Sequence, residues 1–138
     1  MMVKKLPIIG IIDDDKIYQF ILTSIINKNK LAKSILSFSD GEKAIEYLTD
    51  NKTKNEKIPD ILFLDVNMPI MDGWMFIEEY AGIKKDITKK IAVFMLSSSV
   101  NPSDIERAAE ISEISNYIIK PIKFEEVKRI FENYEIFS

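Results

Sequence analysis

One stretch near the middle of the chain constrains the fold more than any other. Residues 61–64 are four consecutive apolar residues that run directly into Asp65, and Pro69 follows four residues later. A short continuous apolar run bounded by turn residues is typical of a buried strand in a parallel sheet. Open parallel sheets bind their ligands beyond the carboxyl ends of the strands. Asp65 is therefore expected where such a sheet places its chemistry.

Similar segments recur along the chain and alternate with helical patterns. Short apolar runs predict five strands, at residues 8–12, 35–38, 61–64, 91–96 and 116–119. Strands that alternate with helices indicate βαβ units, and hence an α/β fold with a parallel sheet covered on both faces. We find no internal repeat and no linker, so we expect one domain over residues 1–138, with its core at about 8–134 and no output domain.

Helical spacing of apolar residues also predicts which side chains face the core. The expected inward residues are Ile17, Phe20, Ile21 and Ile25 in the first helix, Ala44, Ile45 and Leu48 in the second, Phe76, Ile77 and Tyr80 in the third, Ile105, Ala108 and Ala109 in the fourth, and Phe124, Val127, Ile130 and Phe131 in the last. Ser39 with Glu42 reads as a capping box, Asn101 as an N-cap before Pro102, and Gly82 as a helix end.

Composition excludes several classes of function. The chain has no cysteine and no histidine, so any metal must be held by oxygen ligands. The net charge of −3 argues against direct nucleic-acid binding. No apolar run is long enough for a membrane span or a signal peptide, so we expect no membrane contact and a cytoplasmic location.

Charged side chains follow three of the predicted strands. Asp13 and Asp14 follow the first, Asp65 ends the third, and Lys120 follows the fifth. If these strand ends share one edge of the sheet, two of the carboxylates 4 Å apart repel by roughly 4 kcal/mol at an effective dielectric of about 20. One lysine does not offset three such charges. Either a carboxylate is protonated or a divalent cation binds, and an all-oxygen set suits Mg²⁺.

Each of these features also has an ordinary structural explanation. An aspartate run before a helix usually caps that helix, and serines between a strand and a helix, here residues 97–99, usually form a turn. A lone lysine before a proline usually faces solvent. Because all of these features fall at one edge of one sheet, we favour a shared site. A carboxylate beside Mg²⁺ can attack phosphorus, and an ionised Asp65 needs no general base.

Four motifs together resemble the receiver domain of two-component response regulators, the family of the single-domain chemotaxis regulator. The motifs are Ile12-Asp13-Asp14-Asp15, Leu64-Asp65-Val66-Asn67-Met68-Pro69 with Asp72-Gly73, Met95-Leu96-Ser97-Ser98, and Tyr117-Ile118-Ile119-Lys120-Pro121-Ile122. The resemblance covers residues 8–134. It implies a flavodoxin-like, doubly wound sheet of five parallel strands with five helices and strand order 2-1-3-4-5.

The resemblance also assigns roles to individual residues. It implies that Asp65 is the phosphoacceptor, and that Asp13, Asp14 and Asp65 hold Mg²⁺ together with the backbone carbonyl of Asn67. It makes Ser97 and Lys120 the groups that contact the phosphoryl oxygens. Ser97 and Tyr117 fall on the switch positions, and Pro121 is expected to follow a cis peptide bond.

The resemblance further implies a phosphorylatable signalling switch rather than an enzyme in the usual sense. A sensor histidine kinase or a phosphotransfer protein would supply the phosphoryl group, since this chain has no histidine of its own. The output would be an unknown downstream protein or a homodimer formed through the fourth helix, fifth strand and last helix. Stand-alone receivers of phytochrome-type and other sensor kinases share the serine-rich segment followed by Asn-Pro.

Two other functions compete with this interpretation. One is an aspartate-nucleophile phosphatase of the haloacid-dehalogenase type, which usually places a second aspartate two residues after the nucleophile. Asn67 stands there and cannot act as an acid or base. The other is a degenerate receiver that binds partners without being phosphorylated, although every matching acid, hydroxyl and lysine is present.

Overall fold

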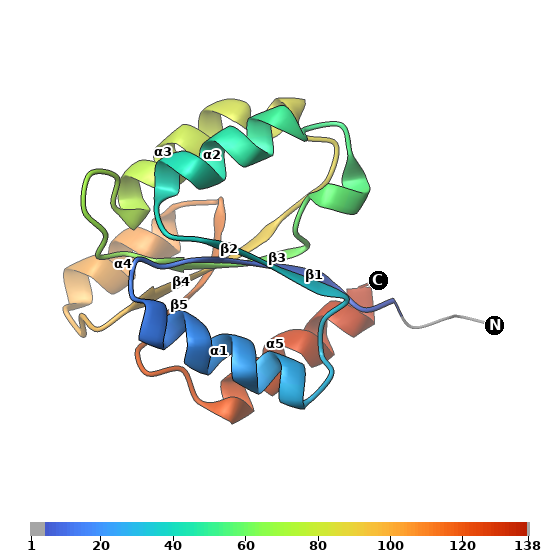
Figure 1. The fold of residues 1–138 in the computed structure, drawn as a ribbon. Coiled ribbons are helices and arrows are strands. Elements are labelled where there is room, and N and C mark those ends of the chain that lie inside the picture. Colours follow the sequence, from blue (N-terminus) through green and yellow to red (C-terminus); the bar gives the residue numbers. More distant parts are fainter. Residues whose placement is uncertain (1–4, 138) are drawn as a thin grey trace.

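A computed structural model describes residues 5–137 and shows one twisted parallel sheet at the centre of the molecule (Figure 1). Its strands are β1 (Ile8–Ile12), β2 (Ser34–Phe38), β3 (Ile61–Asp65), β4 (Ala92–Ser97) and β5 (Ile114–Ile119). They lie in the order β2-β1-β3-β4-β5, so the predicted topology is confirmed. β5 begins two residues earlier than predicted, and its register against β4 is irregular between Val93 and Phe94.

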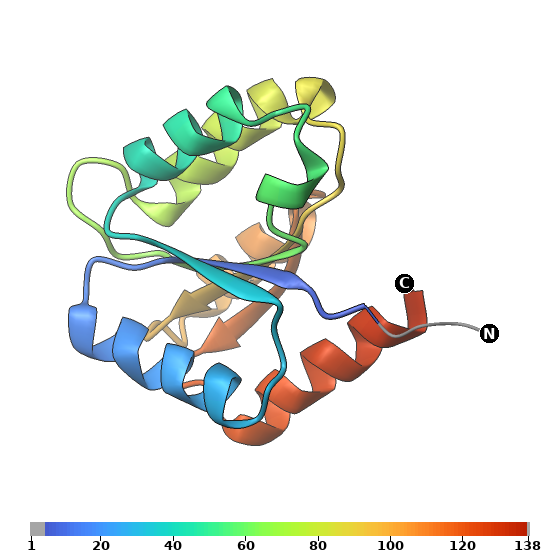
Figure 2. The same ribbon diagram turned by 45° about the vertical axis from the view of Figure 1, so that its right-hand side comes forward.

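Five helices cover the two faces of this sheet (Figures 1 and 2). They are α1 (Lys16–Lys28), α2 (Gly41–Asp50), α3 (Gly73–Ile83), α4 (Pro102–Glu110) and α5 (Phe124–Phe137), with two short 3₁₀ helices, η1 (Asn55–Lys57) and η2 (Lys84–Asp86). α1 and α5 cover one face, and α2, α3 and α4 cover the other. None of the helices in the described residues is both long and apolar enough to cross a bilayer.

The covering helices create two hydrophobic cores, one on each face of the sheet. Successive side chains of β3 alternate between them: Leu62 and Leu64 pack beneath α2 and α3, whereas Ile61 and Phe63 pack against α1 and α5. All five residues of β3 are buried. Burial on both faces explains why this strand reads as a continuous apolar run rather than as an alternating pattern.

The predicted buried face of α1 is wrong. Leu22 and Ile26 are buried, whereas Ile17 and Phe20 are 73% and 72% exposed and Ile21 is 48% exposed. The helix carries apolar residues around most of its circumference, so spacing alone did not identify the face that meets the sheet. Of the four predicted residues, Ile25 is partly buried against the core, and the other three are open to solvent.

Smaller corrections concern helix ends and inward residues. The N-cap of α2 is Asp40, which accepts a hydrogen bond from the Lys43 amide, and not Ser39. Gly82 lies within α3, which continues to Ile83 and then into η2. Three residues predicted to be buried are exposed, namely Ile105, Ala109 and Phe124. The predicted N-cap Asn101 with Pro102 at the start of α4 is confirmed.

Because all strands are parallel, their carboxyl ends lie at one edge of the sheet. Ile12 of β1 pairs with Leu64 of β3, so Asp13, directly after β1, and Asp65, the last residue of β3, lie at the same level. This edge is where the predicted site residues meet.

Candidate functional site

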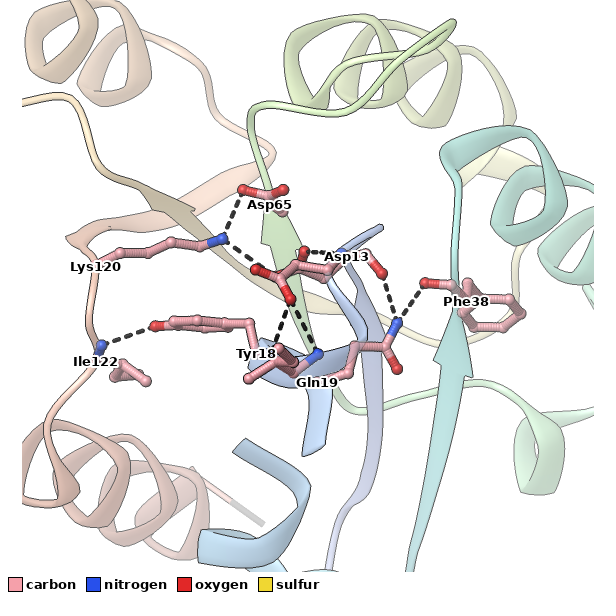
Figure 3. Close-up of polar contacts among 9 residues, drawn as sticks. Asp13, Tyr18, Gln19, Phe38, Asp65, Lys120 and Ile122 are labelled. Atoms are coloured by element: carbon pink, nitrogen blue, oxygen red, sulfur yellow. Dashed lines mark hydrogen bonds and ion pairs between the residues drawn. The ribbon is translucent and has the colours of Figure 1, made fainter. Parts of the chain in front are cut away.

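The centre of the site is a lysine that bridges two buried aspartates (Figure 3). The Nζ atom of Lys120 lies 3.0 Å from Oδ1 of Asp65 and 3.2 Å from Oδ2 of Asp13. Asp13 and Asp65 are only 2% and 4% exposed. The structure therefore brings together three residues that are far apart in the sequence, as the strand ends predict.

The third predicted acid, Asp14, lies beside this pair but is exposed to solvent. Carboxylate oxygens of Asp13, Asp14 and Asp65 all lie within 4.8 Å of one another. Three carboxylates and one ammonium leave an excess of negative charge, which favours a bound cation. All the donor atoms are oxygens, the ligand type that Mg²⁺ prefers. Mg²⁺ also keeps part of its hydration shell, and the exposed Asp14 leaves one side of the cluster open to water. The residues thus fit a magnesium site.

Burial and charge shift the acid–base equilibria of the bridged groups. Burial, together with the charge of Asp13, raises the pKa of Asp65 to about 6, against the lowering effect of Lys120 and of a hydrogen bond from the Asn67 backbone. Burial alone would lower the pKa of Lys120, but its contacts with Asp65 and Asp13 outweigh burial and raise it. Lys120 therefore remains charged at neutral pH, while Asp65 titrates unusually close to neutrality.

The three consecutive aspartates have separate local tasks. Asp15 is the N-cap of α1 and accepts hydrogen bonds from the amides of Ile17 and Tyr18. Asp13 accepts a hydrogen bond from the Asp15 amide through Oδ1, which leaves its other oxygen for Lys120. Capping therefore explains Asp15 alone, and the ordinary explanation leaves Asp13 and Asp14 unaccounted for.

The predicted switch residues lie on the neighbouring strands. The carbonyl of Ser97 accepts a hydrogen bond from the Lys120 amide at 2.8 Å, which places the ends of β4 and β5 side by side. The Ser97 hydroxyl is buried and accepts a hydrogen bond from the Ser99 amide, and the hydroxyl of the half-buried Tyr117 donates to the Ser99 carbonyl at 2.9 Å. Ser97 and Tyr117 are therefore connected through Ser99.

The segment after β3 depends on a glycine. A Cβ atom on Gly73 would lie 2.8 Å from Cα of Val66 and 2.9 Å from the carbonyl oxygen of Asp65. Only a residue without a side chain lets α3 begin this close to Asp65. Asn67 lies in the same segment with an exposed side chain, and Lys120–Pro121 is a cis peptide bond, as expected.

Two residues in the first turn of α1 belong to the site although no sequence motif marks them. Gln19 donates from Nε2 to the carbonyls of Asp13 and Phe38, at 2.7 Å and 2.8 Å, and so joins the ends of β1 and β2. Tyr18 contacts Lys120 and the backbone of Ile122 (Figure 3). The only signal in the sequence was their position directly after the aspartate run.

A known protein family and one of its members are similar to this chain in sequence. The family described as "Response regulator receiver domain" matches residues 9–132. The two-component response regulator ARR12 of Arabidopsis thaliana is 30% identical over 122 residues, which are 88% of this chain and 18% of ARR12. The chain therefore spans less than a fifth of that relative.

Solved structures agree in fold. A two component response regulator from Cytophaga hutchinsonii is 27% identical with a TM-score of 0.86, and the match covers 97% of this chain and 100% of that one. The bacteriophytochrome response regulator RtBRR is 25% identical with a TM-score of 0.76, and the match covers 97% of this chain and 81% of that one.

Proposed function

This chain belongs to the response regulator receiver domain family, and we propose that it accepts a phosphoryl group on Asp65 and thereby switches a partner-binding surface. The observation that supports this most directly is the Lys120 bridge between Asp65 and Asp13. It places a buried carboxylate, a fixed cation and further acids around one small space. Receivers are generally signalling switches rather than classical enzymes, and residues 1–138 would form one such domain.

The transfer itself is a displacement at phosphorus. An oxygen of ionised Asp65 forms the new P–O bond, while the P–N bond to the donor's phosphohistidine breaks and its electron pair stays on the donor nitrogen. Lys120 binds a phosphoryl oxygen through its ammonium, and the Ser97 hydroxyl donates to another. These residues position the group and neutralise its charge, which is most of what phosphoryl transfer requires.

The acidic cluster has its own part in this proposal. Asp13, Asp14, Asp65 and the backbone carbonyl of Asn67 would hold Mg²⁺. A bound Mg²⁺ would neutralise charge on the phosphoryl oxygens. Asp13 and Asp14 supply the negative charge that retains the ion, and Gln19 keeps the backbone carbonyl of Asp13 in place.

Switching follows from the connections of Ser97. A phosphoryl group adds about −1.5 to −2 charges and three acceptor oxygens. If Ser97 moves towards it to donate its hydroxyl proton, the hydrogen bond that the Ser97 oxygen accepts from the Ser99 amide is displaced with it. Tyr117 donates to the carbonyl of the same Ser99. The surface of α4, β5 and α5 would change as a result. Exposed apolar side chains on this surface, Ile105 and Ile119, are available to a partner.

The partners follow from this mechanism. A sensor histidine kinase or phosphotransfer protein would be the donor, and the exposed side of α1 with Ile17 and Phe20 begins at the site where that donor must approach. The output would go to a downstream protein or to a homodimer formed through α4, β5 and α5. A cytoplasmic location without direct nucleic-acid or membrane contact fits these partners.

Intact-mass measurement tests the proposal. Acetyl phosphate with Mg²⁺ should add about 80 Da, the mass of one phosphoryl group, to the wild type and nothing to Asp65→Asn. Asp40→Asn is the matched control, because asparagine caps a helix as well as aspartate does and Asp40 lies at the N-terminus of α2. No adduct on the wild type, or an adduct on Asp65→Asn, would refute Asp65 as the phosphoacceptor.

A further inference from the structure

Tyr18 contacts the segment that carries Lys120 at two points. Its hydroxyl oxygen accepts a hydrogen bond from the Ile122 amide at 2.9 Å, two residues beyond Lys120. Its ring centroid lies 4.2 Å from Nζ of Lys120, which is a cation–π contact. One side chain therefore holds both the backbone after Lys120 and the ammonium itself (Figure 3).

Tyr18 is itself held in a defined place. It lies in the first turn of α1, where its amide donates to Oδ1 of the N-cap Asp15. Asp15 in turn donates through its amide to Asp13. The same short segment thus orients one carboxylate partner of Lys120 and provides the ring against which the lysine rests.

The ring contact differs in kind from the other contacts of Lys120. Asp13 and Asp65 hold the ammonium through carboxylate oxygens, and these oxygens are the ones needed for the cation and for the new P–O bond. The face of an aromatic ring attracts a cation without offering an oxygen ligand. Tyr18 can therefore keep the ammonium in place while the carboxylates change partners.

We propose that Tyr18 is a positioning residue for phosphoryl transfer. Its ring holds the Lys120 ammonium, and its hydroxyl group holds the backbone that follows Lys120. This inference rests on the proposed function, because it assigns Lys120 to the phosphoryl group. It concerns a residue outside the acidic cluster and the switch pair.

Two substitutions separate the ring from the hydroxyl. Tyr18→Phe keeps the cation–π contact and removes the acceptor for the Ile122 amide, whereas Tyr18→Leu removes both. We expect the rate of phosphorylation by acetyl phosphate to fall about twofold in Tyr18→Phe and about tenfold in Tyr18→Leu, as befits the loss of a partly desolvated cation–π contact. If Tyr18→Leu does not fold, Tyr18→Met replaces it as the variant without a ring.

Two further measurements distinguish a loss of Lys120 positioning from a general disruption of the site. Mg²⁺ affinity measured by calorimetry should stay within about twofold of wild type in every variant, since no carboxylate is altered. In the metal-free protein, the ring should shift the NMR signals of the Lys120 ε-methylene upfield in wild type and Tyr18→Phe but not in Tyr18→Leu. Tyr47→Phe is the matched control, since the Tyr47 hydroxyl donates to Lys57 outside the site.

The outcomes are distinct. If the wild type gains no phosphoryl group, the proposed function fails and the inference fails with it. If the wild type is phosphorylated and Tyr18→Leu reacts at the same rate, or shows the same Lys120 signals, only the inference fails. It also fails if Tyr18→Phe and Tyr18→Leu are equally slow, or if they lose Mg²⁺ affinity in proportion to rate, because the role of Tyr18 is then merely structural.

Discussion

Replacing Asp65 by asparagine should stabilise the metal-free protein at neutral pH, although it removes the proposed phosphoacceptor. Asp65 is almost fully buried beside Asp13, and burial together with that charge raises its pKa from 3.8 to about 6. The folded state therefore binds this proton more tightly than the unfolded state does. Stability contributed by protonated Asp65 is fully present below pH 3.8 and is lost as pH rises through about 6.

The size of the effect follows from the shift. A difference of about two pKa units corresponds to about 3 kcal/mol of unfolding free energy, at 1.36 kcal/mol per unit. Asparagine has nearly the same shape and no charge, so it does not incur this loss. The difference in unfolding free energy between Asp65→Asn and wild type should therefore increase by about 2.5 kcal/mol between pH 4 and pH 7.5, because the unfolded-state carboxyl is already partly ionised at pH 4. Since Asp13 and Asp65 interact, this pH-dependent change in unfolding free energy reports the titration of both carboxyl groups together.

Urea unfolding in the presence of EDTA, followed by circular dichroism over this pH range, measures the difference directly. Asp40→Asn serves as the control, because Asp40 lies outside the acidic cluster, and its difference from wild type should stay nearly constant. Mg²⁺ at one hundred times the dissociation constant should remove most of the difference between Asp65→Asn and wild type, since the wild type then gains about 2.7 kcal/mol of binding free energy. A difference that does not depend on pH would refute the reasoning.

Two further pairs of substitutions test the packing around the site by urea unfolding. Leu22→Ala, on the buried side of α1, should lower the unfolding free energy by about 2–5 kcal/mol. Phe20→Ala, on the exposed side, should change it by no more than about 0.5 kcal/mol. Equal losses would contradict the observed orientation of the helix. Gly73→Ala should destabilise the protein by about 1–3 kcal/mol, because its Cβ would meet the backbone of Val66. Gly82→Ala, with no atom within 4 Å of its Cβ, should stabilise the protein by about 0.5–1 kcal/mol. A neutral Gly73→Ala would show that the backbone there can move aside.

The sheet and the acidic side of the site can be predicted from the amino-acid sequence alone. Apolar runs that end in Asp13 and Asp65 identify parallel strands, and parallel strands necessarily bring their carboxyl ends to one edge. Charge repulsion then calls for either a protonated carboxylate or a cation nearby, and Lys120 supplies part of that positive charge. These conclusions depend on local pattern and on the geometry common to all such sheets, so they did not require the path of the chain between the strands.

The buried side of each helix, in contrast, depends on how the helix packs against the sheet. α1 has apolar residues on nearly every side, so its periodicity does not select between the face with Leu22 and the face with Phe20; its position against β1 and β3 does. The exposure of Ile105 on the short helix α4 has the same cause, because only part of that helix contacts the sheet.

The tertiary structure also decided which groups surround Lys120. Tyr18 lies about one hundred residues away in the chain, and a tyrosine after an N-cap has no local property that indicates a lysine partner. Gln19 reaches two carbonyl groups that no sequence pattern marks. Such contacts depend on the angle at which α1 leaves β1 and on the course of the backbone after β5, and these are set by the packing of the whole domain.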